Sequence, residues 1–162
     1  MTISFILNGE DVTAKARSAD RLSDILRTGF GLLGVRSDCR CGRCGRCLVF
    51  LDNRLVPSCI VPAFAARGHE IVTIEGYAQT EDYIDISAGF IDAGVVTCGF
   101  CEGPKIMAAA ALLERIPRPS PEEILEHMSS APCRCTDPDT LVKAVQAVAE
   151  RRARRIYRRA GR

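Results

Sequence analysis

The sequence predicts an α+β protein in two parts, and three observations support this. In residues 1–76, short runs of apolar residues that are typical of strands are interspersed with one or two helical stretches. Beyond Gly76 apolar residues recur at helical spacing, and no further strand is predicted. Nine of the 162 residues are cysteines, and they fall into one group in each part. The composition shifts near residues 77–83, so we expect a first domain at 1–76 and a second from residue 77.

The first part begins with a predicted β-hairpin. The run Ile3–Leu7 alternates apolar and polar residues, and Asn8-Gly9 follows, a pair that accepts the positive φ of a tight hairpin turn. A short helix capped by Ser18 or Asp20 is expected next. Further strands are predicted at residues 48–51, 55–56 and 71–74.

The second part is predicted to be entirely helical. Ile84, Ile86, Phe90 and Ile91 fit an amphipathic segment, and Gly103-Pro104 opens a helix with four consecutive alanines in its core stripe. A third helix starts at the capping box Ser120-Pro121-Glu122-Glu123 and runs to about Met128. The last helix has its apolar face at Leu141, Val145, Val148 and Ala149.

Charge is distributed unevenly, although the net charge is only +2. Residues 151–162 hold seven arginines and no acid, whereas residues 1–150 carry 15 basic and 20 acidic residues. We expect the second domain to end near 157 and a basic tail to occupy 158–162. Because Tyr157 is the only aromatic residue among these arginines, nucleic-acid binding is not expected. An acidic partner or solvent is the expected neighbour.

The sequence predicts a cytoplasmic protein without a membrane span. No run reaches the roughly 18 apolar residues that a transmembrane helix needs, and no secretory signal is recognisable. Disulfides suit secreted chains that lack a core, but this chain is 47% hydrophobic. An odd number of cysteines would also leave one thiol unpaired. The cysteines therefore indicate metal or iron–sulfur ligation.

The first group of cysteines has the spacing Cys39-x4-Cys44-x2-Cys47-x11-Cys59. This is the plant-type [2Fe–2S] pattern, in which a loop supplies three thiolates and a later strand end the fourth. Gly42 and Gly45 let such a loop fold tightly, with positive φ where needed. Cys41 falls outside the spacing, and we interpret it as a spare thiol.

The second group has the spacing Cys98-x2-Cys101-x31-Cys133-x1-Cys135. One pair precedes the Pro104 helix, and the other precedes the last helix. Packed helices could bring the two pairs together around a second four-thiolate cluster. A tetrahedral zinc site is the alternative for either group. Spacing favours iron clearly for the first group, whereas iron and zinc are comparable for the second.

Several motifs together resemble the small iron–sulfur subunit of the molybdenum hydroxylases, the group of xanthine dehydrogenase, aldehyde oxidoreductase and aerobic carbon monoxide dehydrogenase. The resemblance runs from about Thr2 to Glu150, and all eight cysteine spacings agree with it. The matching segments are Asn8-Gly9, Arg21 to Arg27, Cys39 to Cys47, Ser58-Cys59, Thr73-Ile74-Glu75-Gly76, Cys98-Gly99-Phe100-Cys101 and Cys133-Arg134-Cys135-Thr136. Three segments differ from the usual pattern and lie where the small subunit would face the pterin. They are Thr97, Glu102-Gly103-Pro104 and Thr136-Asp137-Pro138.

The resemblance implies a β-grasp, plant-type ferredoxin-like domain followed by a four-helix bundle, each with one [2Fe–2S] cluster. It implies that the chain is the electron-relay subunit of an oxidoreductase complex and not its catalytic subunit. Electrons would come from a large molybdopterin-binding subunit and leave to a medium subunit that binds FAD. The implied assembly is a dimer of heterotrimers.

Three alternatives differ from this interpretation. The chain could serve a divergent or non-molybdenum oxidoreductase, because Thr97 and Glu102 depart from the pattern at the pterin-facing stretch. It could be a free two-cluster ferredoxin. It could also be a zinc-stabilised interaction module, which would be colourless where a [2Fe–2S] protein is red-brown.

Overall fold

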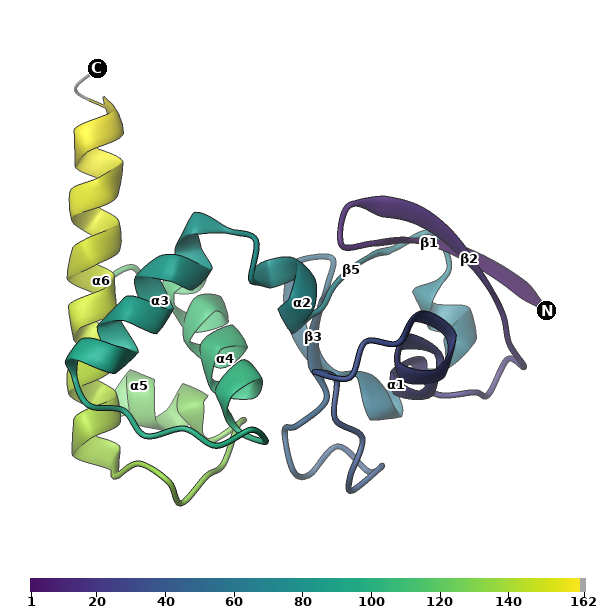
Figure 1. Ribbon diagram of the computed structural model, residues 1–162, viewed down its shortest axis with the longest axis horizontal. Coiled ribbons are helices and arrows are strands. Elements are labelled where there is room, and N and C mark those ends of the chain that lie inside the picture. Colours follow the sequence, from purple (N-terminus) through teal and green to yellow (C-terminus); the bar gives the residue numbers. More distant parts are fainter. Residues whose placement is uncertain (161–162) are drawn as a thin grey trace. The chain divides into compact units, whose positions relative to one another are not determined.

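A computed structural model describes the backbone of residues 1–160 and the side chains as far as Tyr157. The chain divides into two compact units, Met1–Gln79 and a second unit from Thr80 onward. Figure 1 shows a sheet with short helical turns in the first unit and only helices in the second. In the predicted basic tail, residues 158–160 continue the last helix, while their side chains and residues 161–162 lie outside the described part.

The first unit is built on a five-stranded mixed sheet with the order β2-β1-β5-β3-β4. The strands are β1 (Thr2–Leu7), β2 (Glu10–Lys15), β3 (Leu48–Leu51), β4 (Arg54–Pro57) and β5 (Glu70–Val72). Strands β1 and β5 are parallel, and the other neighbours are antiparallel. The predicted hairpin is confirmed, because Asn8 and Gly9 turn with φ of 53° and 87°. This sheet is the expected ferredoxin-like architecture.

Short helical segments cover the sheet. They are α1 (Leu22–Asp24), which continues as a π-helical turn over Ile25–Gly29, the 3₁₀ turns Ser58–Ile60 and Ala63–Ala66, and α2 (Ile74–Tyr77). Neither predicted cap of the first helix is used. Helix α1 begins after Arg21 without a side-chain cap, because the Asp20 carboxylate accepts the Arg17 N–H instead, at 2.9 Å. The last strand is shorter than predicted, because residues 74–77 form α2.

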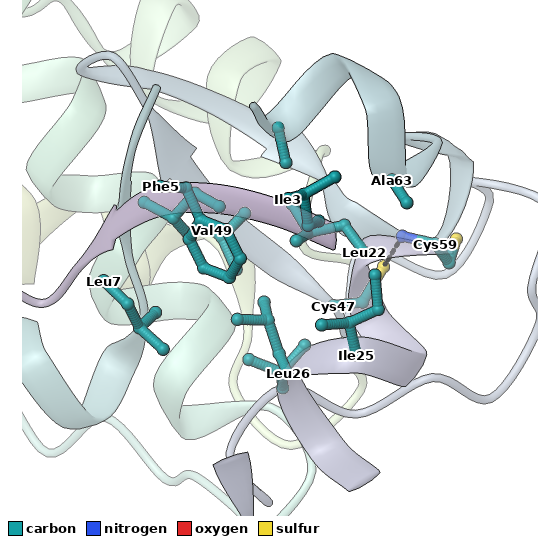
Figure 2. Close-up of a cluster of buried hydrophobic side chains, with 13 residues drawn as sticks. Ile3, Phe5, Leu7, Leu22, Ile25, Leu26, Cys47, Val49, Cys59 and Ala63 are labelled. Atoms are coloured by element: carbon teal, nitrogen blue, oxygen red, sulfur yellow. Dashed lines mark hydrogen bonds between the residues drawn. The ribbon is translucent and has the colours of Figure 1, made fainter. Parts of the chain in front are cut away.

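One apolar core lies between the sheet and these helical segments. Ile3, Phe5 and Leu7 all point to the buried face of β1, as their alternation predicts. Figure 2 shows them beside Leu22 and Leu26. The same core includes two cysteines of the first group, Cys47 and Cys59. The sheet therefore fixes part of that group in a rigid, apolar setting.

The second unit packs four helices, α3 (Glu81–Asp92), α4 (Glu102–Arg115), α5 (Pro121–Met128) and α6 (Pro138–Ala160). The predicted capping box is present, with Ser120 and Glu123 exchanging both hydrogen bonds. The alanines of α4 lie in the core of this unit, as predicted, since every residue from 104 to 113 is buried. The amphipathic pattern expected for α3 holds only in part. Ile86 and Phe90 are buried, whereas Ile84 and Ile91 are exposed.

Several arginines of α6 form ion pairs within their own unit. Arg155 contacts Glu81 at 2.8 Å and Asp85 at 2.9 Å, and Arg152 contacts Asp82 at 2.8 Å. The acids lie on α3, so this part of the arginine run joins two helices of the bundle and is not directed to solvent alone. Among residues 1–160, no helix is long and apolar enough to cross a membrane.

Candidate iron–sulfur centres

The first cysteine group lies on one loop and one turn of the sheet unit. Cys39, Cys44 and Cys47 belong to the segment that leads into β3, and Cys59 sits in the 3₁₀ turn after β4. The loop turns sharply, with positive φ at Gly42 and Gly45 as predicted. Arg40 shares this conformation with φ of 56°, which the sequence did not indicate.

Backbone amides are directed at the sulfurs of this group. The N–H of Gly42 donates to Cys59 Sγ at 3.2 Å, and the N–H of Cys44 donates to Cys39 Sγ at 3.4 Å. The N–H of Cys59 donates to Cys47 Sγ at 3.4 Å, a contact drawn in Figure 2. Amide donors stabilise ionised sulfur, which is the form that binds iron. The arrangement therefore fits a thiolate-ligated centre.

The four predicted ligands of this group approach in two pairs. Cys39 interacts with Cys44, and Cys47 interacts with Cys59. A [2Fe–2S] cluster with four cysteine ligands has two ligands on each iron, whereas zinc takes all four on one ion. An arrangement in two pairs therefore fits the cluster better than a single tetrahedral zinc site. Cys41 is exposed, and its backbone N–H donates to the Cys39 sulfur.

The two sides of this group differ in burial. Cys47 and Cys59 are buried, while Cys39 and Cys44 are partly exposed. Hydrogen bonds from the backbone of Cys41 and Cys44 lower the pKa of the free Cys39 thiol to about 6. Burial raises the pKa of the free Cys47 thiol to about 12. One side of the centre therefore lies within the core, and the other lies near the surface.

The arginines of the loop are partly neutralised by acids. Arg40 contacts Asp24 at 2.6 Å, and Arg46 lies 3.9 Å from Asp38. These are exposed or half-exposed pairs, whose effect is weak and screened by salt. Arg40 and Arg46 are therefore expected to contribute little net positive charge at the centre.

The second cysteine group lies where two loops of the helical unit meet. Cys98 and Cys101 form the turn before α4, and Cys133 and Cys135 lie between α5 and α6. The hydroxyl of Thr136 donates to the carbonyl of Val96, which joins one loop to the other. The sulfurs of Cys98, Cys101 and Cys135 all lie within 4.8 Å of one another. No other such group of three is found among the described residues.

Hydrogen bonds within the second group resemble those of the first. The N–H of Cys98 donates to Cys101 Sγ at 3.3 Å, and the N–H of Cys135 donates to Cys133 Sγ at 3.1 Å. Burial raises the pKa of the free Cys101 thiol to about 12, whereas the backbone N–H of Phe100 lowers that of Cys98 to about 7. The structure thus brings Cys135 to Cys98 and Cys101, whereas Cys133 lies outside this group of three and contacts the thiols of Cys101 and Cys135.

The positions that depart from the resemblance lie beside this group. Thr97 is partly buried, and Glu102 is exposed as the first residue of α4. Helix α4 begins at Glu102, two residues before Pro104, and Cys101 occupies its N-cap position. Val96 and Phe100, which flank Cys98, are half-exposed or more. Two exposed apolar side chains and one exposed carboxylate are therefore close in sequence to Cys98 and Cys101.

Comparisons with known proteins agree with the geometry. A family described as a 2Fe-2S iron-sulfur cluster binding domain matches residues 5–70, and one described as a [2Fe-2S] binding domain matches residues 73–146. The nicotinate dehydrogenase small FeS subunit of Eubacterium barkeri is 38% identical over 151 residues, which is 93% of this chain and 96% of that protein. The xanthine dehydrogenase iron-sulfur-binding subunit of Escherichia coli O157:H7 is 36% identical over 148 residues, or 90% and 92% of the two chains.

A solved structure shows the same fold. A chain of quinoline 2-oxidoreductase from Pseudomonas putida 86 superimposes with a TM-score of 0.85 at 35% sequence identity. The match covers 95% of this chain and 96% of that one. Both units therefore share the fold of one chain of this oxidoreductase. The matched domains favour iron over the zinc alternative.

Proposed function

The chain belongs to the small iron–sulfur subunits of the molybdenum hydroxylases, and on that premise we propose which residues hold its two clusters. Cys39, Cys44, Cys47 and Cys59 bind one [2Fe–2S] cluster in a first domain of residues 1–76. Cys98, Cys101, Cys133 and Cys135 bind the other in a second domain of residues 77–157. The observation that supports this proposal is that backbone amides donate to cysteine sulfurs in both units, and that the sulfurs of Cys98, Cys101 and Cys135 lie within 4.8 Å of one another.

The chain is an electron-relay subunit of an oxidoreductase, and the chemistry on substrate belongs to a partner. Each cluster supplies a site that takes up one electron and gives it away again. The role of the protein is to hold the sulfurs, to provide amide donors and to keep part of each site buried. In this family the partner subunits carry molybdopterin and FAD.

We propose further that the helical domain receives electrons from the molybdopterin subunit and that the ferredoxin-like domain delivers them to the FAD subunit. The half-exposed surface around Val96 and Phe100 supports a contact there with the donor. A dimer of heterotrimers in the cytoplasm is the proposed assembly.

Iron analysis and EPR spectroscopy of the native complex test the ligand proposal. Two [2Fe–2S] clusters require about four iron atoms per copy of this chain. Reduction with dithionite should give two overlapping signals of equal intensity, because one centre lies in a glycine- and arginine-rich loop and the other between helices. A single signal with half of that iron would contradict the proposal. The mass of the native complex separately tests the assembly.

A further inference from the structure

Lys105 is the only charged side chain among the fully buried residues of the described part of the chain, and it is 2% exposed. Lysine is almost never buried to this degree unless it is paired, because its ammonium is strongly hydrated in water. None of the ion pairs within the described residues involves Lys105. Its charge therefore needs a different negative partner.

The position of Lys105 in α4 places it next to the second cysteine group. It follows Cys101 by four residues, and its N–H donates to the Cys101 carbonyl at 3.0 Å. Residues four apart share one face of a helix, so the Lys105 side chain projects from the face on which Cys101 lies.

Cys101 connects Lys105 to the other loop of the group. The Cys101 sulfur lies within 4.8 Å of the sulfurs of Cys98, in its own loop, and of Cys135, in the loop before α6. The buried Lys105, on the face of α4 that carries Cys101, is therefore close to cysteines that come from both loops.

We propose that Lys105 raises the reduction potential of the [2Fe–2S] cluster in the helical domain and so favours its reduction by the substrate-oxidising partner. The proposal rests on the ligand assignment above. Reduction adds one electron, supplied by the partner, to the thiolate-ligated iron and therefore adds one negative charge. A fixed ammonium nearby stabilises this more negative state over the oxidised one.

Because it is buried, Lys105 should affect the reduction potential of a cluster more than the other cations near the cysteines do. Arg40 is exposed and paired with Asp24, and Arg134 is exposed between Cys133 and Cys135. Water and salt screen exposed charges. Lys105 is shielded from both, so its attraction for the added electron is stronger than that of an exposed arginine. The sequence gives no sign of this, because a lysine one turn into a helix is usually solvated.

Redox titration of the intact complex, followed by EPR spectroscopy, tests the proposal with Lys105→Met. Methionine keeps the length of the side chain and removes its charge. We expect the equilibrium constant for one-electron reduction of the helical-domain cluster to fall about tenfold, which corresponds to a midpoint about 59 mV lower. The ferredoxin-like cluster should keep its midpoint and serve as an internal reference. Lys105→Arg, which keeps the charge, should restore most of the shift.

Lys143→Met is the matched control, because Lys143 is an exposed lysine of the same domain. It removes the same charge and should leave both midpoints unchanged. An unchanged midpoint in Lys105→Met with full iron content, or an equal shift in Lys143→Met, would overturn the proposal. If Lys105→Met does not retain iron, Lys105→Gln is measured under the same criteria. Failure of the ligand assignment would instead appear in the wild-type complex, as a missing EPR signal.

Discussion

Single backbone N–H groups hold the sulfurs of the first centre in position. Gly42, which donates one of these N–H groups, adopts φ of 77°, and a side chain there would meet Ile60 Cδ1 at 3.3 Å. Cys41 supplies a backbone contact to Cys39 while its own thiol remains exposed. Neighbouring residues of the loop therefore have two different roles. Some are proposed to bind iron through their sulfur, and others only donate a backbone N–H to those sulfurs.

This division predicts opposite results for two neighbouring cysteines. Cys41→Ser should keep full iron content and both EPR signals, because serine preserves the backbone N–H that faces Cys39. Cys44→Ser should lose the signal of the ferredoxin-like domain, because it removes a proposed ligand. Iron content and EPR spectra of both variants, in the same preparation of the complex, make the comparison. Loss of that signal in Cys41→Ser would show that the ligand assignment is wrong.

The amide at Gly42 can be tested separately. Gly42→Ala imposes positive φ on an alanine and crowds Ile60, so it should displace the N–H that donates to Cys59. Gly68→Ala is the matched control, since Gly68 has φ of 75° with open space around it. Both should lose about 1–3 kcal/mol of stability through backbone strain. Only Gly42→Ala should also shorten the lifetime of the cluster, measured as bleaching of visible absorbance in air. Equal lifetimes would contradict a role for this amide.

At the scale of elements, periodicity and capping patterns predict most of the fold. The alternation from Ile3 to Leu7 and the box at Ser120 both form as expected, because each depends on neighbours close in sequence. The exposure of Ile84 and Ile91 could not be predicted. A helix shows its period in its sequence, but which arc it buries depends on the helices that pack against it.

Prediction of the candidate sites from the sequence is limited in the same way. Cysteine spacing predicts two sets of ligands, since the geometry of a cluster limits the lengths of the intervening loops. It does not predict that Arg40 and Arg46 lie against acids or that Lys105 is buried, because these are long-range consequences of packing. Local chemistry can thus be read from the sequence, whereas the electrostatic surroundings cannot.

Helices α3 and α6 pack closely at Gly89, and this predicts the effect of adding a side chain there. A Cβ on Gly89 would lie 2.4 Å from Cγ2 of Val148, a fully buried side chain. Alanine gains up to about 1 kcal/mol in helix propensity over glycine, but overpacking a buried site costs about 1–3 kcal/mol. Gly89→Ala should therefore destabilise the helical domain in thermal or urea unfolding. In a Val148→Ala background, Gly89→Ala should cost less stability than it does in the wild-type chain, and strict additivity of the two substitutions would contradict the packing argument.

At the scale of the whole molecule, the two units place their cysteines differently. In the sheet unit, Cys47 and Cys59 are part of the apolar core. In the helical unit, one loop before α4 and another before α6 supply the cysteines, and the hydroxyl contact of Thr136 joins these loops. Iron at the second site would join two connections of the bundle that are far apart in sequence. The second cluster is therefore expected to stabilise its domain as well as carry electrons.

Removal of one proposed ligand tests this expectation. Structural metal sites contribute on the order of 10 kcal/mol to folding, which is comparable to the entire stability of a domain, about 5–15 kcal/mol. Cys135 is exposed, so replacing its side chain removes little apolar packing. Cys135→Ala should nevertheless yield a subunit that is insoluble or partly unfolded in its helical domain and that does not assemble with its partners.

Cys41→Ala is the control for this experiment, because it removes a comparably exposed thiol that lies outside both proposed ligand sets. Circular dichroism melting and hydrogen exchange should show protection in α4 and α6 lost in Cys135→Ala and kept in Cys41→Ala. A soluble, assembled Cys135→Ala protein with unchanged melting would mean that the four helices fold on their apolar core alone. The packing of residues 104–113 would then account for the stability of the domain, and the second centre would serve electron transfer without a structural role.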